Sequence, residues 1–331
     1  MIEIKKYNPD LEQAHIDFAS KYWTKSRRKI PEYIYWKFRR KNEEDLSSFL
    51  LAVKEGVVIG QLGLIPSDVY VDGKIYQSQW ACDLMVDNAY RGSGIAKLLY
   101  EFAHKQKEIT FGSDPSPAAY KSMTKSGYHT IKASWKLLFS VNIGGILKLK
   151  SINIPFFNYV PNIFLLFFLF WNAIRKQLFK KISKEQYQLI NDIKNESEYV
   201  STVQNDDFIS WRHNSFKHYY IGIESFVNKK GTSFSGFYVD NSYYITNFKI
   251  TNLYGFFDVI SQIIDQYRKE GLQTIRLFCN DEKLSKQLPF FGFIKFRTRS
   301  KVIFYTDNKD LIKAISSKKF YYTYSDSDEN I

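Results

Sequence analysis

Two stretches of this chain, residues 1–145 and 200–331, show the same order of predicted strands and helices. In the first stretch, alternating apolar residues, turn signals and helical periodicity predict a strand, two helices, three strands, a helix, a strand, a helix and a last strand. This order indicates an α/β fold of the α+β kind, with one mixed sheet and helices on both faces. The second stretch repeats the order more faintly, so we expect an internal duplication.

Short local similarities mark corresponding points of the two stretches. Residues 291–293 resemble residues 126–128, with a glycine at the start of a strand, and residues 210–213 resemble residues 35–38 around a tryptophan. We therefore expect one domain over residues 1–145, a connecting segment over 146–199 and a second, degenerate domain over 200–331.

The connecting segment contains an unbroken apolar run at 163–171, followed by four basic residues. A bilayer-spanning helix needs roughly 18 or more apolar residues, so this run is too short to cross a membrane. We expect it to pack in a core or between the two halves. Peripheral membrane contact, with the basic residues at the surface, is the alternative. These basic residues are Arg175, Lys176, Lys180 and Lys181.

The chain is strongly basic, with 47 Lys and Arg against 34 Asp and Glu and a formal net charge of +13. Such a balance favours a polyanionic partner, which includes nucleic acid, an acidic membrane surface and a phosphorylated small molecule. The basic residues are spread along the chain and are not interleaved with a nucleic-acid-binding motif. We therefore expect a small-molecule substrate and no nucleic acid.

Cysteine usage and the N-terminus bear on the compartment. Cys82 and Cys279 are the only cysteines, too few for a disulfide framework, and no Cys/His cluster has zinc-ligand spacing. The first residues alternate like a strand and lack the apolar region of a signal peptide. We expect a protein of the reducing cytoplasm that holds no metal.

The sharpest local signal lies at residues 86–96, where a predicted strand enters a glycine-containing loop that opens a helix. Backbone N–H groups of such a loop and of the helix N-terminus form an anion site, and glycines let the backbone approach a pyrophosphate closely. No Gly-Lys-Ser/Thr follows, which excludes a P-loop. The G-x-G-x-x-G fingerprint of dinucleotide-binding folds is also absent.

This loop resembles the R-x-x-G-x-G/A loop of the GNAT superfamily of coenzyme A-dependent N-acyltransferases, and it has the same place between strand and helix. The resemblance covers residues 1–135 in element order. It implies an acyl-coenzyme A donor whose pyrophosphate is held by the loop backbone, and a preceding strand that pairs with pantetheine and offers an N–H near the thioester carbonyl. Leu84 and Val86 match that strand. The implied loop residues are Arg91, Gly92, Ser93, Gly94, Ile95 and Ala96.

A second motif of the family, N-x-x-A-x-x-x-Y-x-x-x-G-F, is only partly matched. Counted back from Gly127, Ser116 stands in place of the asparagine, and Met123 stands where the family has the tyrosine that protonates the leaving thiolate. Tyr120, one turn earlier on the same predicted helix, is our candidate for that general acid. Otherwise Tyr120 packs, and water serves as the acid.

A general base must take a proton from the amine nucleophile. Asp83 is the first candidate, as base or substrate anchor, because a carboxylate inside an apolar strand is costly unless it is paired or functional. Asp114, at the end of the next strand, is the second, and a structural hydrogen-bonding role is the alternative for both. Strand alternation places Cys82 and Asp83 on opposite faces, and no neighbouring histidine supports Cys82 as a nucleophile.

The second stretch has no phosphate loop at the matching place, residues 250–256, so we expect it to bind no coenzyme A and to shape the acceptor pocket. The chain resembles, more weakly, tandem nucleotide-sugar N-acyltransferases of surface-polysaccharide pathways, which implies a nucleotide-linked amino sugar as acceptor. Transferases that build peptide bridges from charged transfer RNA are a second option. They usually lack the pyrophosphate loop, which counts against them here. N-acetyltransferases of another small amine or of a protein remain alternatives, as does a non-catalytic, membrane-associated binding protein.

Overall fold

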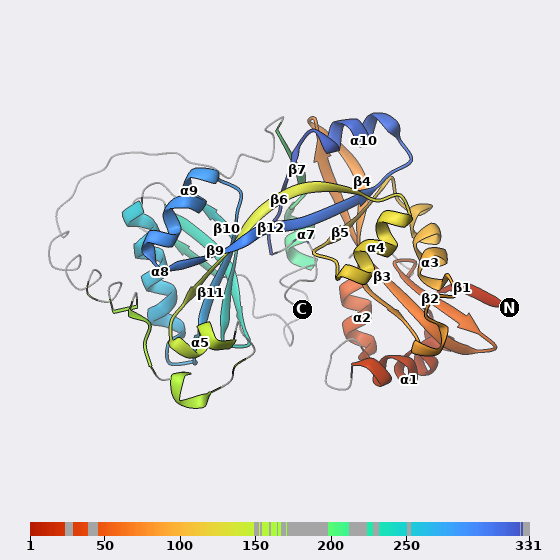
Figure 1. Cartoon of the computed structure of the whole chain (residues 1–331), viewed down its shortest axis with the longest axis horizontal. Coiled ribbons are helices and arrows are strands. Elements are labelled where there is room, and N and C mark those ends of the chain that lie inside the picture. Colours follow the sequence, from red (N-terminus) through yellow and green to blue (C-terminus); the bar gives the residue numbers. More distant parts are fainter. Residues whose placement is uncertain are drawn as a thin grey trace.

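One mixed sheet runs through both halves of the computed structural model (Figure 1). The structure describes residues 1–23, 29–38, 46–148, 152, 154–158, 160–163, 165, 166, 170, 198–211, 224–227, 232–249, 253–324 and 326. In spatial order the strands are β1 (Ile2–Lys6), β2 (Phe49–Lys54), β3 (Val57–Val71), β4 (Lys74–Val86), β5 (Ile109–Ser113), β12 (Phe293–Tyr305), β6 (His129–Ser140), β11 (Thr274–Cys279), β10 (Ser242–Lys249), β9 (Ser233–Val239) and β8 (Glu224–Val227). Two short strands, β7 (Tyr199–Thr202) and β13 (Lys319–Tyr321), pair with each other and join β3 and β6 beside this path.

Helices cover both faces of the N-terminal part of the sheet, as the sequence predicted. Side chains of α1 (Glu12–Tyr22) and α2 (Pro31–Phe38) pack with Trp80 and Phe111 on one face. Side chains of α3 (Ile95–His104) and α4 (Pro117–Lys125) pack with Leu62 and Leu64 on the other. The expected strands and helices of residues 1–140 are confirmed, with ends that shift by a few residues.

The second half repeats the strand pairings of the first. The antiparallel β3–β4 hairpin and the parallel β4–β5 pair correspond to the antiparallel β9–β10 hairpin and the parallel β10–β11 pair. Helix α8 (Leu253–Tyr267) joins β10 to β11 as α3 joins β4 to β5, and α9 (Glu282–Gln287) follows β11 as α4 follows β5. Gly127 and Gly292, which have positive φ angles of 88° and 86°, precede the long strands β6 and β12. The predicted strand at 219–225 lies largely outside the described residues.

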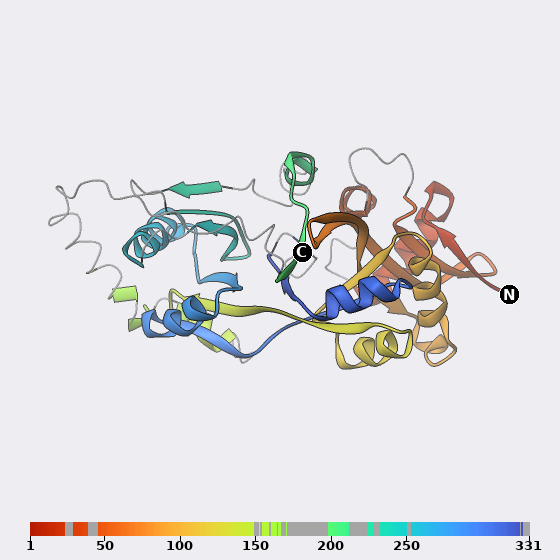
Figure 2. The same ribbon diagram turned by 90° about the horizontal axis from the view of Figure 1, so that it is seen from above.

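The long strands β6 and β12 are shared between the two halves. The C-terminal end of β12 enters the first half, where Val302–Tyr305 pair with Ser113–Thr110 of β5. The C-terminal end of β6 enters the second half, where Trp135–Ser140 pair with Cys279–Thr274 of β11. Figure 2 shows the two strands side by side between the halves. A cut at residue 145 would therefore remove β12, one of the two strands that pair with β5.

Two tryptophans tie the halves together a second time. The indole N–H of Trp36 in α2 donates to the Trp211 carbonyl at 3.0 Å, and the indole N–H of Trp211 donates to the Trp36 carbonyl at 2.7 Å. These are the tryptophans that the sequence placed at corresponding points. After α10 (Lys309–Ser316), the segment at β13 returns to the first half, where Phe320 and Tyr322 pack against Trp80.

The apolar run at 163–171 lies only partly within the described residues. Leu165 is buried in the core of the second half, whereas Ile163, Leu166 and Phe170 are 74%, 53% and 65% exposed. Among the described helices, none is both long enough and apolar enough to cross a membrane.

Candidate active site

Strand β4 contains a bulge at Asp83 and Leu84. The pairing with β3 passes from Gly63 opposite Cys82 to Gln61 opposite Met85, so two residues of β4 lie opposite Leu62. Asp83 has a φ of 50°, in a region that aspartate adopts more readily than most residues. Cys82 packs with the core on the α1/α2 face, and Asp83 binds a lysine of α2 on that face. The prediction that Cys82 and Asp83 point to opposite faces is therefore wrong, because the bulge interrupts the alternation.

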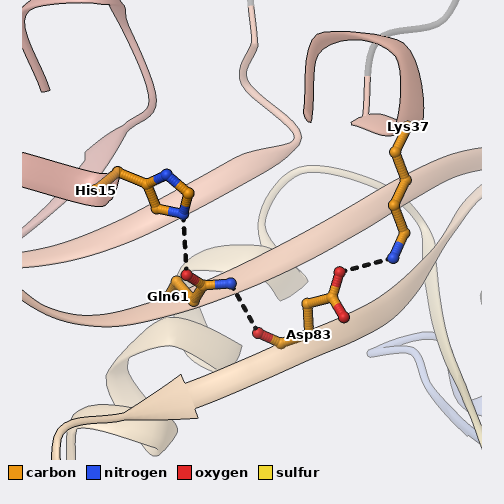
Figure 3. Close-up of polar contacts among 4 residues, drawn as sticks. All are labelled: His15, Lys37, Gln61 and Asp83. Carbon is orange, nitrogen blue, oxygen red and sulfur yellow. Dashed lines mark hydrogen bonds and ion pairs between the residues drawn. The ribbon is translucent and has the colours of Figure 1, made fainter. Parts of the chain in front are cut away.

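The Asp83 side chain is held in a buried ion pair. Its Oδ2 lies 2.6 Å from the Nζ of Lys37, and the two side chains are 5% and 0% exposed. Gln61 on β3 donates from Nε2 to the Asp83 backbone carbonyl at 3.2 Å, and its Oε1 contacts His15 Nε2 of α1 at 3.1 Å. Figure 3 shows the four side chains on one side of β3 and β4. The ion pair fixes the carboxylate, and Gln61 fixes the backbone of the same bulged residue.

Burial is the main influence on the pKa of His15. It lowers the pKa of the His15 imidazole to about 4, with the Gln61 hydrogen bond and the Asp83 charge acting in the opposite direction. Since Gln61 bonds the Asp83 carbonyl and not its carboxylate, these contacts do not connect the imidazole to the Asp83 carboxylate. The geometry thus shows a support for the bulge, and the role of Asp83 as base stays a prediction.

Strands β4 and β5 separate beyond the first half of β4. Their parallel pairing joins Ser78, Gln79 and Trp80 to β5 and then ends, while β4 continues to Val86. Within the described residues, the part of β4 from Ala81 onward is paired with β3 alone. The predicted residues Leu84 and Val86 lie on this stretch, half-buried against the core beneath α3. On its β5 side this stretch has no strand pairing within the described part of the chain, an arrangement that suits an extended ligand.

The glycine-containing loop follows directly at the end of β4. Gly92 and Gly94 have φ angles of 85° and 88°, and a Cβ built on either glycine meets no atom within 4 Å. Gly94 is the N-cap of α3, whose first three N–H groups, starting at Ile95, have no acceptor within the helix. Residues 91–94 are exposed, whereas the Ile95 side chain is buried, so Ile95 can contribute its N–H to a ligand. The loop is exposed and lies at a helix N-terminus. The N–H groups of Arg91 and Ser93 donate within it, to the carbonyls of Asn88 and Tyr90 at 3.4 and 3.3 Å, so the N–H groups at the start of α3 are the donors that suit an anion.

The three residues of the second motif, Ser116, Tyr120 and Met123, lie at or in helix α4 and have different surroundings. Ser116 is its N-cap and accepts from the Ala119 N–H at 3.3 Å. Met123 is buried against Gly112 of β5, so it fills the core and faces no solvent. The Tyr120 hydroxyl lies 3.1 Å from Thr130 Oγ1 of β6, at the side of the helix that faces the shared strands.

Asp114 links β5 to both shared strands. Its Oδ1 accepts from the Lys301 N–H of β12 at 2.6 Å, and its Oδ2 lies 2.6 Å from Lys136 Nζ of β6. The Lys301 Nζ lies 5.3 Å from the centre of the Tyr120 ring. Lys136 and Lys301 were missed by the sequence analysis because nothing in their local pattern indicates that β6 and β12 border β5. Lys37 could have been found from the sequence, because a lysine between Trp36 and Phe38 in an apolar helix indicates a buried charge that needs a partner.

Residues 3–108 match the family described as acetyltransferase (GNAT) domain. The N-terminal part of this chain is a GNAT domain. The matched residues contain β1–β4, the glycine loop and α3, and they place the protein in the class of acyl-coenzyme A-dependent N-acyltransferases. A search of curated proteins finds no match.

Solved structures resemble the chain beyond the GNAT domain. A probable N-acyltransferase of unknown function from Enterococcus faecalis V583 has a TM-score of 0.53 at 9% identity, covering 91% of this chain and 72% of that one. A GCN5-related N-acetyltransferase from Anabaena variabilis ATCC 29413 has a TM-score of 0.52 at 12% identity, covering 93% of this chain and 73% of that one. At these identities the likeness concerns the fold. It extends over both halves of the chain.

Proposed function

We propose that this protein transfers an acyl group from acyl-coenzyme A to the amino group of a nucleotide-linked amino sugar, by direct attack of the amine on the thioester. One observation carries the donor half of this proposal. The stretch of β4 beyond its pairing with β5, the bulge at Asp83 and Leu84, and the exposed loop at 91–94 follow one another at one end of the same strand. That arrangement offers an extended edge and an anion cradle to one molecule.

The residues present fit the donor. Gly92 and Gly94 leave open space where side chains would otherwise stand, and the first N–H groups of α3 have no acceptor within the helix. The loop residues Arg91 to Ala96 would hold the pyrophosphate, and Leu84 and Val86 would lie along the pantetheine arm. The donor supplies an acyl group activated as a thioester. The protein supplies binding, orientation and an N–H from the bulged strand toward the carbonyl.

We propose two candidate bases, Asp83 and Asp114, and one candidate acid, Tyr120, for proton transfer. Asp83 and Asp114 each lie 2.6 Å from a lysine Nζ. An adjacent cation favours the ionised carboxylate and makes it a weaker base. We therefore assign Asp83 first to holding the bulge, with its role as base left to experiment. The Tyr120 hydroxyl is the general acid of this proposal, since phenols can protonate a departing thiolate.

The acceptor is proposed from charge and from the second half of the chain. The net charge of +13 suits two polyanionic substrates. The second half repeats the pairing order of the GNAT domain, and we propose that it is a degenerate GNAT-like repeat that shapes the acceptor pocket. Acetylation of another small amine or of a protein is the second candidate. A non-catalytic binding protein is disfavoured by the intact loop.

The experiment is a screen of acyl-coenzyme A donors against amino nucleotide-sugars, with free thiol as the readout. Acceptor-dependent thiol release with an amino nucleotide-sugar, and none with the matching hydroxyl sugar, supports the proposal. Release with simple amines alone would move the assignment to the second candidate. No release with any amine, together with no coenzyme A binding, would favour the binding protein.

A further inference from the structure

Three lysines lie side by side on three neighbouring strands. Lys301 of β12 is directly opposite Lys132 of β6, and Lys132 is directly opposite Lys319 of β13. The residues next to them, Ile131, Val302 and Phe320, all belong to the core on the α1/α2 face. Strand alternation therefore places the three lysines on the other face, which carries α3 and α4. We call them the lysine row, and we propose that it binds a phosphate-class anion of one of the two substrates.

The row has an unbalanced charge. Lys132 and Lys301 are exposed and Lys319 is half-buried, and among the described residues none of the three forms an ion pair. Like charges directly opposite one another destabilise a sheet. Asp114, which follows β5 beside Lys301, is engaged with Lys136 and with the backbone N–H of Lys301. A bound polyanion would relieve this repulsion.

The row lies at the same end of the sheet as the donor loop. The backbone N–H of Lys301 donates to Asp114 just after the C-terminal end of β5, and the loop follows the C-terminal end of β4, which is parallel to β5. The order β4, β5, β12 and β6 puts Lys301 two strands from β4. At about 4.8 Å per paired strand, Lys301 lies about 5 Å from β5, the strand that borders the opening between β4 and β5. A substrate held where β4 and β5 separate can therefore reach the row with a second phosphate.

Strand exchange is what assembles the row. Lys132 belongs to the first half, whereas Lys301 and Lys319 come from the end of the chain and reach Lys132 only because β12 and β13 pair with β6. Lysine ammonium groups act as point charges toward phosphate and do not require a planar partner. The row therefore suits a phosphate or diphosphate. Its source is the 3′-phosphate of coenzyme A or, resting on the proposed function, the diphosphate of the acceptor.

The test uses the full-length variant Lys132→Gln/Lys301→Gln and a charge-matched control, Lys74→Gln/Lys283→Gln, whose lysines are also exposed. Calorimetric titration at low salt measures coenzyme A, 3′-dephospho-coenzyme A, a uridine diphosphate probe and inorganic pyrophosphate. We expect the row variant to lose about 5- to 30-fold in affinity for at least one phosphate probe that binds the wild type, with the control within twofold.

The probes separate the two sources and separate this inference from the proposed function. A loss for coenzyme A but not for its 3′-dephospho form assigns the row to the donor. A loss for uridine diphosphate or pyrophosphate with unchanged coenzyme A binding assigns it to the acceptor. The inference is overturned if both variants bind every probe with equal affinity. Because coenzyme A binding to the loop is measured in the same titrations, a protein that keeps its donor site but lacks the phosphate site is recognised as such.

Discussion

The Lys37 ammonium lies 2.6 Å from the Asp83 carboxylate beneath the bulge of β4, and neither side chain is more than 5% exposed. Two charges taken out of water in this way need each other, and removal of one leaves the other uncompensated. The pair also joins α2 to the bulged residue, whose carbonyl is held by Gln61. The position of the β4 edge therefore depends on a contact that is 46 residues apart in sequence.

Asp83→Asn should destabilise the protein by about 3–5 kcal/mol, because Lys37 then stays buried without a counter-charge. The double variant Lys37→Met/Asp83→Leu should recover most of this loss, since an apolar pair of similar volume needs no hydration. Urea unfolding of the wild type and both variants measures the two changes. Equal stability of Asp83→Asn and the wild type would show that the pair is dispensable.

Kinetic measurements on Lys37→Arg and on the double variant distinguish two roles of Asp83, as the general base or as a support for the bulge. If Asp83 only holds the bulge, Lys37→Arg retains most of the rate, and the double variant lowers kcat at every pH while coenzyme A affinity stays near the wild-type value. If Asp83 is the base, the double variant loses about 10²–10⁴-fold in rate and also loses the acidic limb of the pH profile. A retained acidic limb supports the positioning role.

Stability should fall as the pH drops below neutral. Burial lowers the pKa values of His15 and His104 from 6.5 to about 4. Between these values the unfolded chain binds protons that the folded protein does not, so the free energy of unfolding decreases from about pH 6.5 down to about pH 4. For His15, which is fully buried, the loss is up to about 3 kcal/mol.

His104→Phe provides the check on this pH dependence. The phenyl ring can keep the stacking that His104 makes with Tyr305 while removing one of the two titrating groups. Urea midpoints measured between pH 4 and 7 should show a shallower decline than in the wild type. An unchanged decline would mean that His104 does not contribute to the acid sensitivity.

Residues 1–145 alone should be poorly soluble. Without β12, the edge of β5 loses its partner, and residues 135–140 of β6 lose β11. Unpaired edges and uncovered apolar surface promote aggregation. Expression of this fragment beside the full chain, followed by gel filtration, measures the effect. A monodisperse fragment with full activity would contradict both the shared-strand architecture and a two-part acceptor site.

Substitution of the aromatic residues of the second half tests how that half folds. Trp211, Phe234, Phe237 and Tyr243 are all buried, so alanine at these positions tests folding and not acceptor binding. Exposed lysines of the shared strands are the better probes of the acceptor site, since they change charge without opening a cavity.

The order of elements was predictable because each strand and helix of residues 1–140 carries its own local pattern. The shared strands were not. Apolar alternation along β6 and β12 gives the same signal whichever strands they pair with, so the exchange, and with it Lys301 beside Asp114, depends on tertiary contacts. The bulge at Asp83 also escaped prediction. It adds a residue to one strand only, and alternation alone cannot show that.

The loop at Gly92 and Gly94 tests the central claim most directly. Gly94→Asp adds a negative charge at an exposed position with open space around the new Cβ. The φ of 88° strains a residue with a Cβ by about 1–2 kcal/mol, a cost at which the fold should survive. Gly56→Asp is the matched control, with a φ of 79° and open space in the β2–β3 turn. Titration with coenzyme A should show at least a tenfold loss of affinity for Gly94→Asp and none for Gly56→Asp. Equal coenzyme A affinity in the two variants would contradict the assignment of this loop as the donor site.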